Sequence, residues 1–199
     1  QLKQIQKELG TDNQREEEIE EYRKKLEAKK EHMDEDAYKE IKKQIDKLSR
    51  MHPDSADANL IQSYLDWVIE IPFGKLSKKA LDVLEVKSQL DKDHYSLEKP
   101  KERIEEFFAV RELLSKRGIA DKSANGAILC FAGPPGVGKT SLANSIAKAL
   151  KRKLVRIALG GLEDVNELRG HRRTYIGAMP GRIVQGIIEA GEMNPVVVL

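Results

Sequence analysis

A glycine-rich segment constrains the fold of this chain more than any other feature. Residues 133–140 match the pattern G-x-x-x-x-G-K-[ST] at every fixed position. Such a loop normally follows a strand and opens a helix, because its backbone turns sharply and then presents helix N–H groups. An apolar run at 127–132 precedes the segment, and Leu142, Ile146 and Leu150 follow it at helical spacing. The segment therefore predicts a phosphate-binding loop between a strand and a helix.

The residue types in this loop suit a nucleoside triphosphate. Glycines let successive N–H groups point inward, and the helix N-terminus adds partial positive charge. Lys139 supplies a full positive charge for the β and γ phosphates, and the Thr140 hydroxyl can ligate Mg²⁺. We expect ATP and Mg²⁺ as cofactors, with Thr140 as the metal ligand; a glycine-rich turn without a ligand is the competing interpretation. The predicted nucleotide-binding residues of this segment are Gly133, Pro134, Pro135, Gly136, Val137, Gly138, Lys139, Thr140 and Ser141.

Hydrolysis requires more than this loop. A carboxylate at the end of a neighbouring strand has to hold the metal and polarise water. Residues 195–199 predict that strand, and no carboxylate follows it in the sequence. Glu163, Asp164 and Glu167 belong to the second βα unit, which is the wrong place for this role. We expect nucleotide binding without competent hydrolysis, and no catalytic residue among these 199 residues.

The pattern of apolar residues divides the chain into a helical part and an α/β part. About half of residues 1–50 are charged, and their apolar residues recur at helical spacing. Helices are predicted over residues 1–9, 13–32, 34–50, 56–70, 79–90 and 97–117. Beyond them, strands are predicted at 127–132, 154–159 and 195–199, and helices at 139–150, 163–168 and 180–191. This alternation is typical of a parallel sheet covered by helices.

The predicted fold class is therefore an α-helical N-terminal region followed by an α/β P-loop NTPase subdomain with a parallel, truncated sheet. The helical region is predicted to consist of long charged helices in a hairpin or bundle. We place the domains at 1–74 for the helical region, 75–125 for a helical lead-in, and 126–199 for a partial nucleotide-binding domain.

Composition narrows the class of partner. The net charge is only +2, whereas a dedicated nucleic-acid-binding surface usually brings a large basic excess, so only weak DNA binding stays open. No apolar stretch approaches 18 residues, so we expect no membrane partner. Cys130 is the single cysteine, which excludes a disulfide within the chain and fits a reducing compartment. We expect Cys130 to be a buried side chain of the strand 127–132.

Further segments carry a resemblance to a known family. Residues 168–182 read LRGHRRTYIGAMPGR and follow Gly160 and Gly161. Other matching segments are 64–67 with 71–74, and 93–97 with 101–104. Together they resemble the AAA+ module of ATP-dependent Lon proteases, over essentially the whole chain. The stretch from Gly170 to Gly181 is far more discriminating than the phosphate-binding loop, which many unrelated ATPases share.

The resemblance implies a function for the full-length protein. It implies an ATP-dependent serine endopeptidase, a homohexameric ring that pulls unfolded or damaged proteins into a protease chamber. Tyr175 and Ile176 would be pore-loop residues that grip the substrate, and Gly177 would let that loop bend. His94 and Tyr95, together with Leu97, would lie near the adenine.

The resemblance also implies what lies elsewhere. The family's Ser–Lys protease dyad belongs to a C-terminal domain outside these residues, so we expect the 199-residue chain to be inactive as a protease. Residues 1 to about 70 would join a substrate-recruiting domain to the ring. The implied location is the cytoplasm of a bacterium, or the mitochondrial matrix if the source is eukaryotic.

Two alternatives stay open on the residues alone. A nucleic-acid remodelling ATPase, such as a clamp or helicase loader, shares the loop and would bind DNA tightly and in a salt-dependent way. An interaction module would use residues 1–70 for protein contacts and leave the loop idle, so it would bind unfolded protein but not ATP.

Overall fold

The computed structural model is predominantly helical, with one small parallel sheet. It divides into two compact units, residues 1–76 with 157–193, and residues 77–156 with 194–199. None of the helices in the described part of the chain has the length and apolar composition needed to cross a membrane. The predicted helix over 1–9 lies outside the described residues. The structure describes residues 11–77, 81–118, 128–160, 164–172, 174–175 and 177–199.

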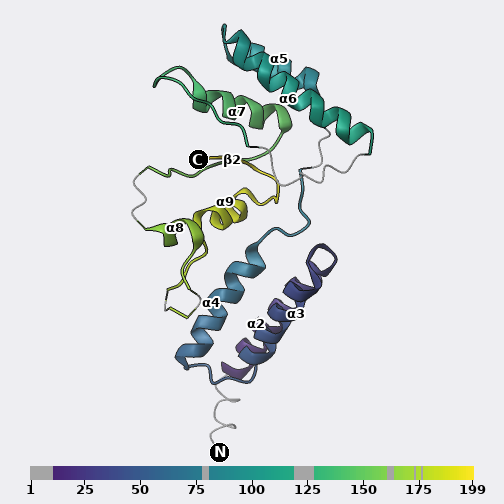
Figure 1. Ribbon diagram of the computed structural model, residues 1–199. Helices are drawn as coiled ribbons and strands as arrows, with labels where there is room; N and C mark the ends of the chain where they lie inside the picture. The colour runs from purple at the N-terminus through teal and green to yellow at the C-terminus, as the bar shows by residue number, and fades with distance from the viewer. Residues whose placement is uncertain (1–10, 78–80, 119–127, 161–163, 173, 176) are drawn as a thin grey trace, which may run out of the picture. The chain divides into compact units, whose positions relative to one another are not determined.

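Three helices of the first unit lie side by side (Figure 1). They are α2 (Thr11–Glu27), α3 (Glu35–Leu48) and α4 (Ala56–Glu70), with the short 3₁₀ helix η1 (Lys30–His32) between the first two. The predicted helix 13–32 is too long, because the chain leaves α-helical geometry after Glu27. The apolar stripes of the three helices meet in a core made of Ile19, Leu26, Ile41, Ile45, Leu48, Ala58 and Leu65.

Both ends of α4 are closed by side chains. The Ser55 hydroxyl accepts a hydrogen bond of 3.2 Å from the Ala58 N–H, which satisfies one donor of the first turn. At the other end, the Lys29 ammonium donates to the carbonyls of Ile69 and Ile71. Burial lowers the pKa of Lys29. These contacts explain why α4 has the bounds that the sequence predicts.

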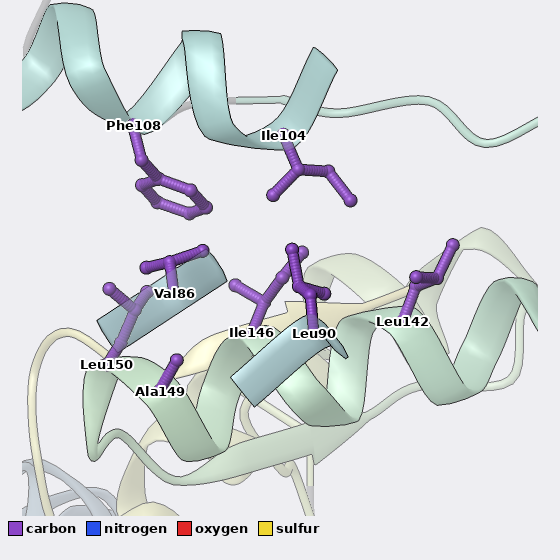
Figure 2. Packing of buried hydrophobic residues seen from close by; sticks show 8 residues of the cluster. All are labelled: Val86, Leu90, Ile104, Phe108, Leu142, Ile146, Ala149 and Leu150. Atoms are coloured by element: carbon purple, nitrogen blue, oxygen red, sulfur yellow. The ribbon is translucent and has the colours of Figure 1, made fainter. Parts of the chain in front are cut away.

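The second unit is built around three further helices. They are α5 (Val83–Asp93), α6 (Glu98–Lys116) and α7 (Lys139–Leu150). Figure 2 shows apolar side chains of α6 pointing toward those of α5 and α7, so that one cluster joins all three helices. Its buried members are Val86, Leu90, Ile104, Phe108, Leu142, Ile146, Ala149 and Leu150. This core holds the helix that follows the glycine-rich loop.

The predicted bounds of α5 are wrong at both ends. The helix begins at Val83 because the Asp82 carboxylate accepts from the Leu84 N–H at 2.9 Å. It then continues through 91–93, where a turn was predicted.

The sheet consists of β1 (Leu154–Arg156) and β2 (Val196–Val198). The two strands are parallel, and Val155 lies opposite Val197, which confirms the prediction of a parallel sheet. Both strands are shorter than predicted.

The predicted strand at 127–132 and the predicted burial of Cys130 are wrong for the described residues. Residues 128–132 have no strand geometry, Ile128 is 94% exposed, and Cys130 is exposed. A strand needs a hydrogen-bonded neighbour, and the sheet of the described residues pairs only β1 with β2. An apolar run alone therefore does not form a strand here.

Candidate functional site

The glycine-rich loop turns into α7 through two residues in the left-handed region. Gly136 has φ +80° and Gly138 has φ +91°, values that cost other residues free energy. A Cβ at position 138 would also come within 3.0 Å of the Ser141 hydroxyl oxygen. The backbone conformation thus favours glycine at Gly138, directly before the first helical residue, and a Cβ there would also have to displace the Ser141 hydroxyl slightly.

The N-terminus of α7 is shaped to receive an anion. The first backbone bond of the helix joins the Leu142 N–H to the Gly138 carbonyl at 3.0 Å. The N–H groups of residues 139–141 precede that bond and have no acceptor within the helix. They add to the positive end of the helix dipole. This donor set fits the oxygens of a phosphate chain.

Lys139 completes the positive charge of the loop. Its half-buried side chain turns back over the loop, and the ammonium donates to the carbonyls of Gly133 at 2.8 Å and Pro134 at 2.6 Å. Phosphate oxygens carry charge and accept more strongly than these neutral carbonyls. A phosphate bound at the start of α7 would therefore compete with the carbonyl groups that the ammonium now contacts.

The hydroxyl groups of the first turn of α7 differ in their partners. The Ser141 hydroxyl donates to the Gly138 carbonyl at 2.7 Å, which stabilises the loop itself. Thr140 is exposed beside it and belongs to the same helical turn. Elsewhere in the described residues, no three His, Cys, Asp or Glu side chains gather as they would around a metal ion.

The corner between α5 and α6 packs on α7 through His94. The His94 imidazole lies 2.9 Å from the hydroxyl oxygen of Ser145, a buried residue of α7. Tyr95 is fully exposed, whereas Leu97 is half-buried against the core. Ser96 and Leu97 have φ values of +60° and +62°. The structure thus places His94 and Leu97 inward and leaves Tyr95 in solvent.

Sequence reasoning missed the polar group beside His94. The Ser145 hydroxyl donates to the Asp93 carboxylate at 2.8 Å, and the Lys148 ammonium lies 3.2 Å from the same oxygen. Hydrogen bonds from Gln89, Ser145 and Lys148 lower the pKa of Asp93 to about 2. The one sequence signal was a serine on the apolar face of the helix 139–150, where a hydroxyl needs a partner.

The predicted pore loop belongs to the first unit, where it lies between α8 (Val165–Arg169) and α9 (Arg182–Ala190). Gly170 pairs with Pro180 in an isolated antiparallel bridge that closes the loop. A Cβ at Gly181 would lie 2.0 Å from the Leu168 carbonyl oxygen, so the base of the loop has no room for a side chain. Gly170 and Gly181, which begin and end the stretch 170–181, therefore allow the two sides of the loop to approach closely at its base.

Tyr175 lies in the part of this loop away from its base. Its N–H donates to the Arg172 carbonyl at 3.0 Å, and its carbonyl accepts from the Ala178 N–H at 3.1 Å. The Tyr175 side chain is 60% exposed. Ile176, the second predicted pore-loop residue, lies outside the described residues.

The chain is similar to part of a known family of proteases. Residues 129–199 match the profile described as "ATPase family associated with various cellular activities (AAA)". The whole chain is 80% identical over 199 residues to the Lon protease of Campylobacter concisus, and covers 25% of that protein. It is 65% identical over 203 residues to the Lon protease of Helicobacter pylori, covering 24% of it. It is 53% identical over 199 residues to the Lon protease of Aquifex aeolicus, again covering 24%.

Proposed function

Because this chain belongs to the Lon protease family and spans about a quarter of the length of these relatives, we propose that it is the part that binds ATP and Mg²⁺. The observation that carries the proposal is the joint placement of Gly138, Lys139 and the first turn of α7. A loop of this shape concentrates N–H donors and one ammonium on a small volume, which is the complement of a polyphosphate.

Each residue of the loop has a separate task in this proposal. The N–H groups of residues 136–141 would surround the β phosphate, and Lys139 would exchange its carbonyl partners for β and γ oxygens. Thr140 would hold Mg²⁺ together with phosphate oxygens and water, since Mg²⁺ is rarely held by protein ligands alone. In the whole protein, hydrolysis of the bound ATP would supply the free energy that the motor converts into movement.

The corner between α5 and α6 would face the base. Tyr95 is exposed and would be able to stack on a purine ring, and the neighbouring His94 lies 2.9 Å from the Ser145 hydroxyl of α7. The base and the phosphates would then be bound by one compact unit, because α5, α6 and α7 share a core.

In the whole protein, we propose that this binding drives the handling of protein substrates. Tyr175 and Ile176 would grip unfolded or damaged chains inside a homohexameric ring, and a separate serine protease domain would cleave them. The exposed side chain of Tyr175 on a narrow-based loop supports the gripping role, since an aromatic ring can press on polypeptides of any sequence. A nucleic-acid remodelling ATPase, considered above as an alternative, is not favoured by the relatives of this chain.

The proposal is tested by titrating a fluorescent ATP analogue with Mg²⁺ into the unchanged chain and into Lys139→Ala. Lys99→Ala is the matched control, because Lys99 is an exposed lysine of α6 in the same unit. We expect Lys139→Ala to lose at least tenfold in affinity, the equivalent of about 1.4 kcal/mol, and Lys99→Ala to bind as the unchanged chain does. Equal affinities of all three proteins would refute a role for the loop.

A further inference from the structure

We propose that Ser145 and Asp93 are positioning residues for nucleotide binding, which fix the α5–α6 corner against the helix that carries the phosphate-binding loop. This inference rests on the proposed function and deepens it. In this inference, Ser145 and Asp93 do not touch the nucleotide. They hold the α5–α6 corner in the position from which it contacts the base.

The bridge joins residues that are far apart in sequence. His94 and Ser145 are separated by 51 positions, and Asp93 and Ser145 by 52. Ser145 is only 2% exposed and the Asp93 side chain is 19% exposed, so both bonds are partly shielded from water. Hydrogen bonds in such surroundings are costly to leave unmade, which makes the bridge a defined contact between α5 and α7.

The direction of the hydrogen bonds follows from the single proton of the serine. The proton of the Ser145 hydroxyl has two acceptors within reach, the Asp93 carboxylate at 2.8 Å and the Ser141 carbonyl at 3.2 Å. It donates to Asp93, because that bond is shorter and the carboxylate is ionised, with a pKa of about 2. The hydroxyl oxygen then accepts from His94, which requires a proton on Nε2 of that ring. The imidazole is thereby committed to α7 and its orientation is fixed.

A second contact fixes the backbone of the same corner. The Lys101 ammonium donates to the His94 carbonyl at 2.8 Å and to the Asp91 carboxylate at 2.9 Å. Lys101 is only 8% exposed, which is unusual for a lysine and indicates that its position is determined by these partners. His94 is therefore held twice, by its ring from α7 and by its carbonyl from α6.

The two attachments of His94 explain why the residues that follow it adopt a strained backbone conformation. Ser96 and Leu97 follow one another in the left-handed region, where non-glycine residues are strained. Such strain persists only where surrounding contacts impose it, and it is concentrated at binding sites. Between the attached His94 and this pair lies Tyr95, which is fully exposed. The contacts thus stabilise a rigid corner that presents one aromatic ring to solvent.

The corner also lies within reach of the loop. An α-helix rises about 1.5 Å per residue, so Ser145 lies roughly 9 Å along α7 from Lys139. That is within the length of a nucleoside triphosphate. A nucleotide with its phosphates at the start of α7 is therefore long enough for its base to reach the flank of the helix to which the corner is attached.

The test compares two ligands that differ only in the nucleoside. ATP and inorganic tripolyphosphate, each with Mg²⁺, are titrated calorimetrically into the unchanged chain, Ser145→Ala and Asp93→Asn. We expect both substitutions to weaken ATP about tenfold and to change tripolyphosphate less than twofold, because the loop itself is intact. Ser115→Ala, at an exposed serine of α6, is the matched control and should change neither ligand.

The affinities of the variants for ATP and tripolyphosphate distinguish a positioning role from a purely structural one. A parallel loss of ATP and tripolyphosphate in folded variants would mean that the bridge only supports the unit as a whole, and unchanged ATP affinity would mean that it supports nothing; either overturns the inference. If Ser145→Ala does not fold, as judged by circular dichroism, Asp93→Asn still gives the comparison, because it changes a polar side chain outside the apolar core. Failure of the proposed function would look different, since the unchanged chain would then bind neither ligand, and the inference would fail with it.

Discussion

Gly138→Ala tests how the loop geometry controls binding. The substitution places a Cβ at φ +91° and 3.0 Å from the Ser141 hydroxyl oxygen, so it combines backbone strain with a close contact. Strain of this kind costs about 1–3 kcal/mol. If the loop relieves it by leaving the binding conformation, ATP affinity falls roughly 5- to 150-fold. Calorimetric titration with MgATP measures this loss, and thermal unfolding shows whether the second unit stays folded.

Gly118→Ala is the matched control for this prediction. Gly118 follows α6 in the same unit, has φ +64°, and a Cβ there would meet no atom within 4 Å. It should therefore share the backbone strain and lower stability, but leave ATP affinity unchanged. Equal loss of affinity in both variants, or full affinity in Gly138→Ala, would refute the reasoning that the conformation at position 138 forms the site.

Three further predictions concern the core, the polar bridge and the pore loop. Leu90→Ala removes a fully buried side chain from the α5–α6–α7 core and should destabilise that unit by about 2–5 kcal/mol, measured by urea unfolding. Asp93 has a folded pKa of about 2, below its ordinary 3.8, so its contribution to stability is present above pH 3.8 and is lost as the pH falls toward 2. The difference in unfolding midpoint between the unchanged chain and Asp93→Asn should therefore shrink over that interval, and a constant difference would contradict the assignment. Tyr175→Ala, made in the full-length protein, should slow degradation of an unfolded substrate several-fold without weakening ATP binding, because Tyr175 is exposed on a separate loop; unchanged degradation would argue against gripping.

The sequence predicted best those elements that local signals delimit. The bounds of α4 and α7 were predicted correctly, because Ser55 and Pro72 flank one helix and the glycine-rich loop opens the other. The bounds of α5 differ from those predicted, because the Asp82 side chain caps the helix at Val83 and the helix continues to Asp93. The strand at 127–132 failed because strand formation depends on a partner that local sequence does not specify.

In the candidate site, too, the sequence predicts what a local motif specifies and misses what tertiary contacts create. The loop follows from a motif in which each residue type has its own physical reason, so Gly138, Lys139 and Thr140 could be named from the sequence. The bridge from Asp93 and His94 to Ser145 could not, because it depends on tertiary contacts between helices more than 40 residues apart in sequence. The predicted domain boundaries at 74 and 125 remain predictions.

The most direct measurement of the central claim is an amide NMR spectrum of the chain, recorded before and after addition of MgATP. The account predicts that the largest shifts fall on the N–H groups of residues 136–141, which form the proposed phosphate cradle, while those of α2 and α3 stay in place. Shifts confined to α2 and α3, or no shift at saturating nucleotide, would contradict it.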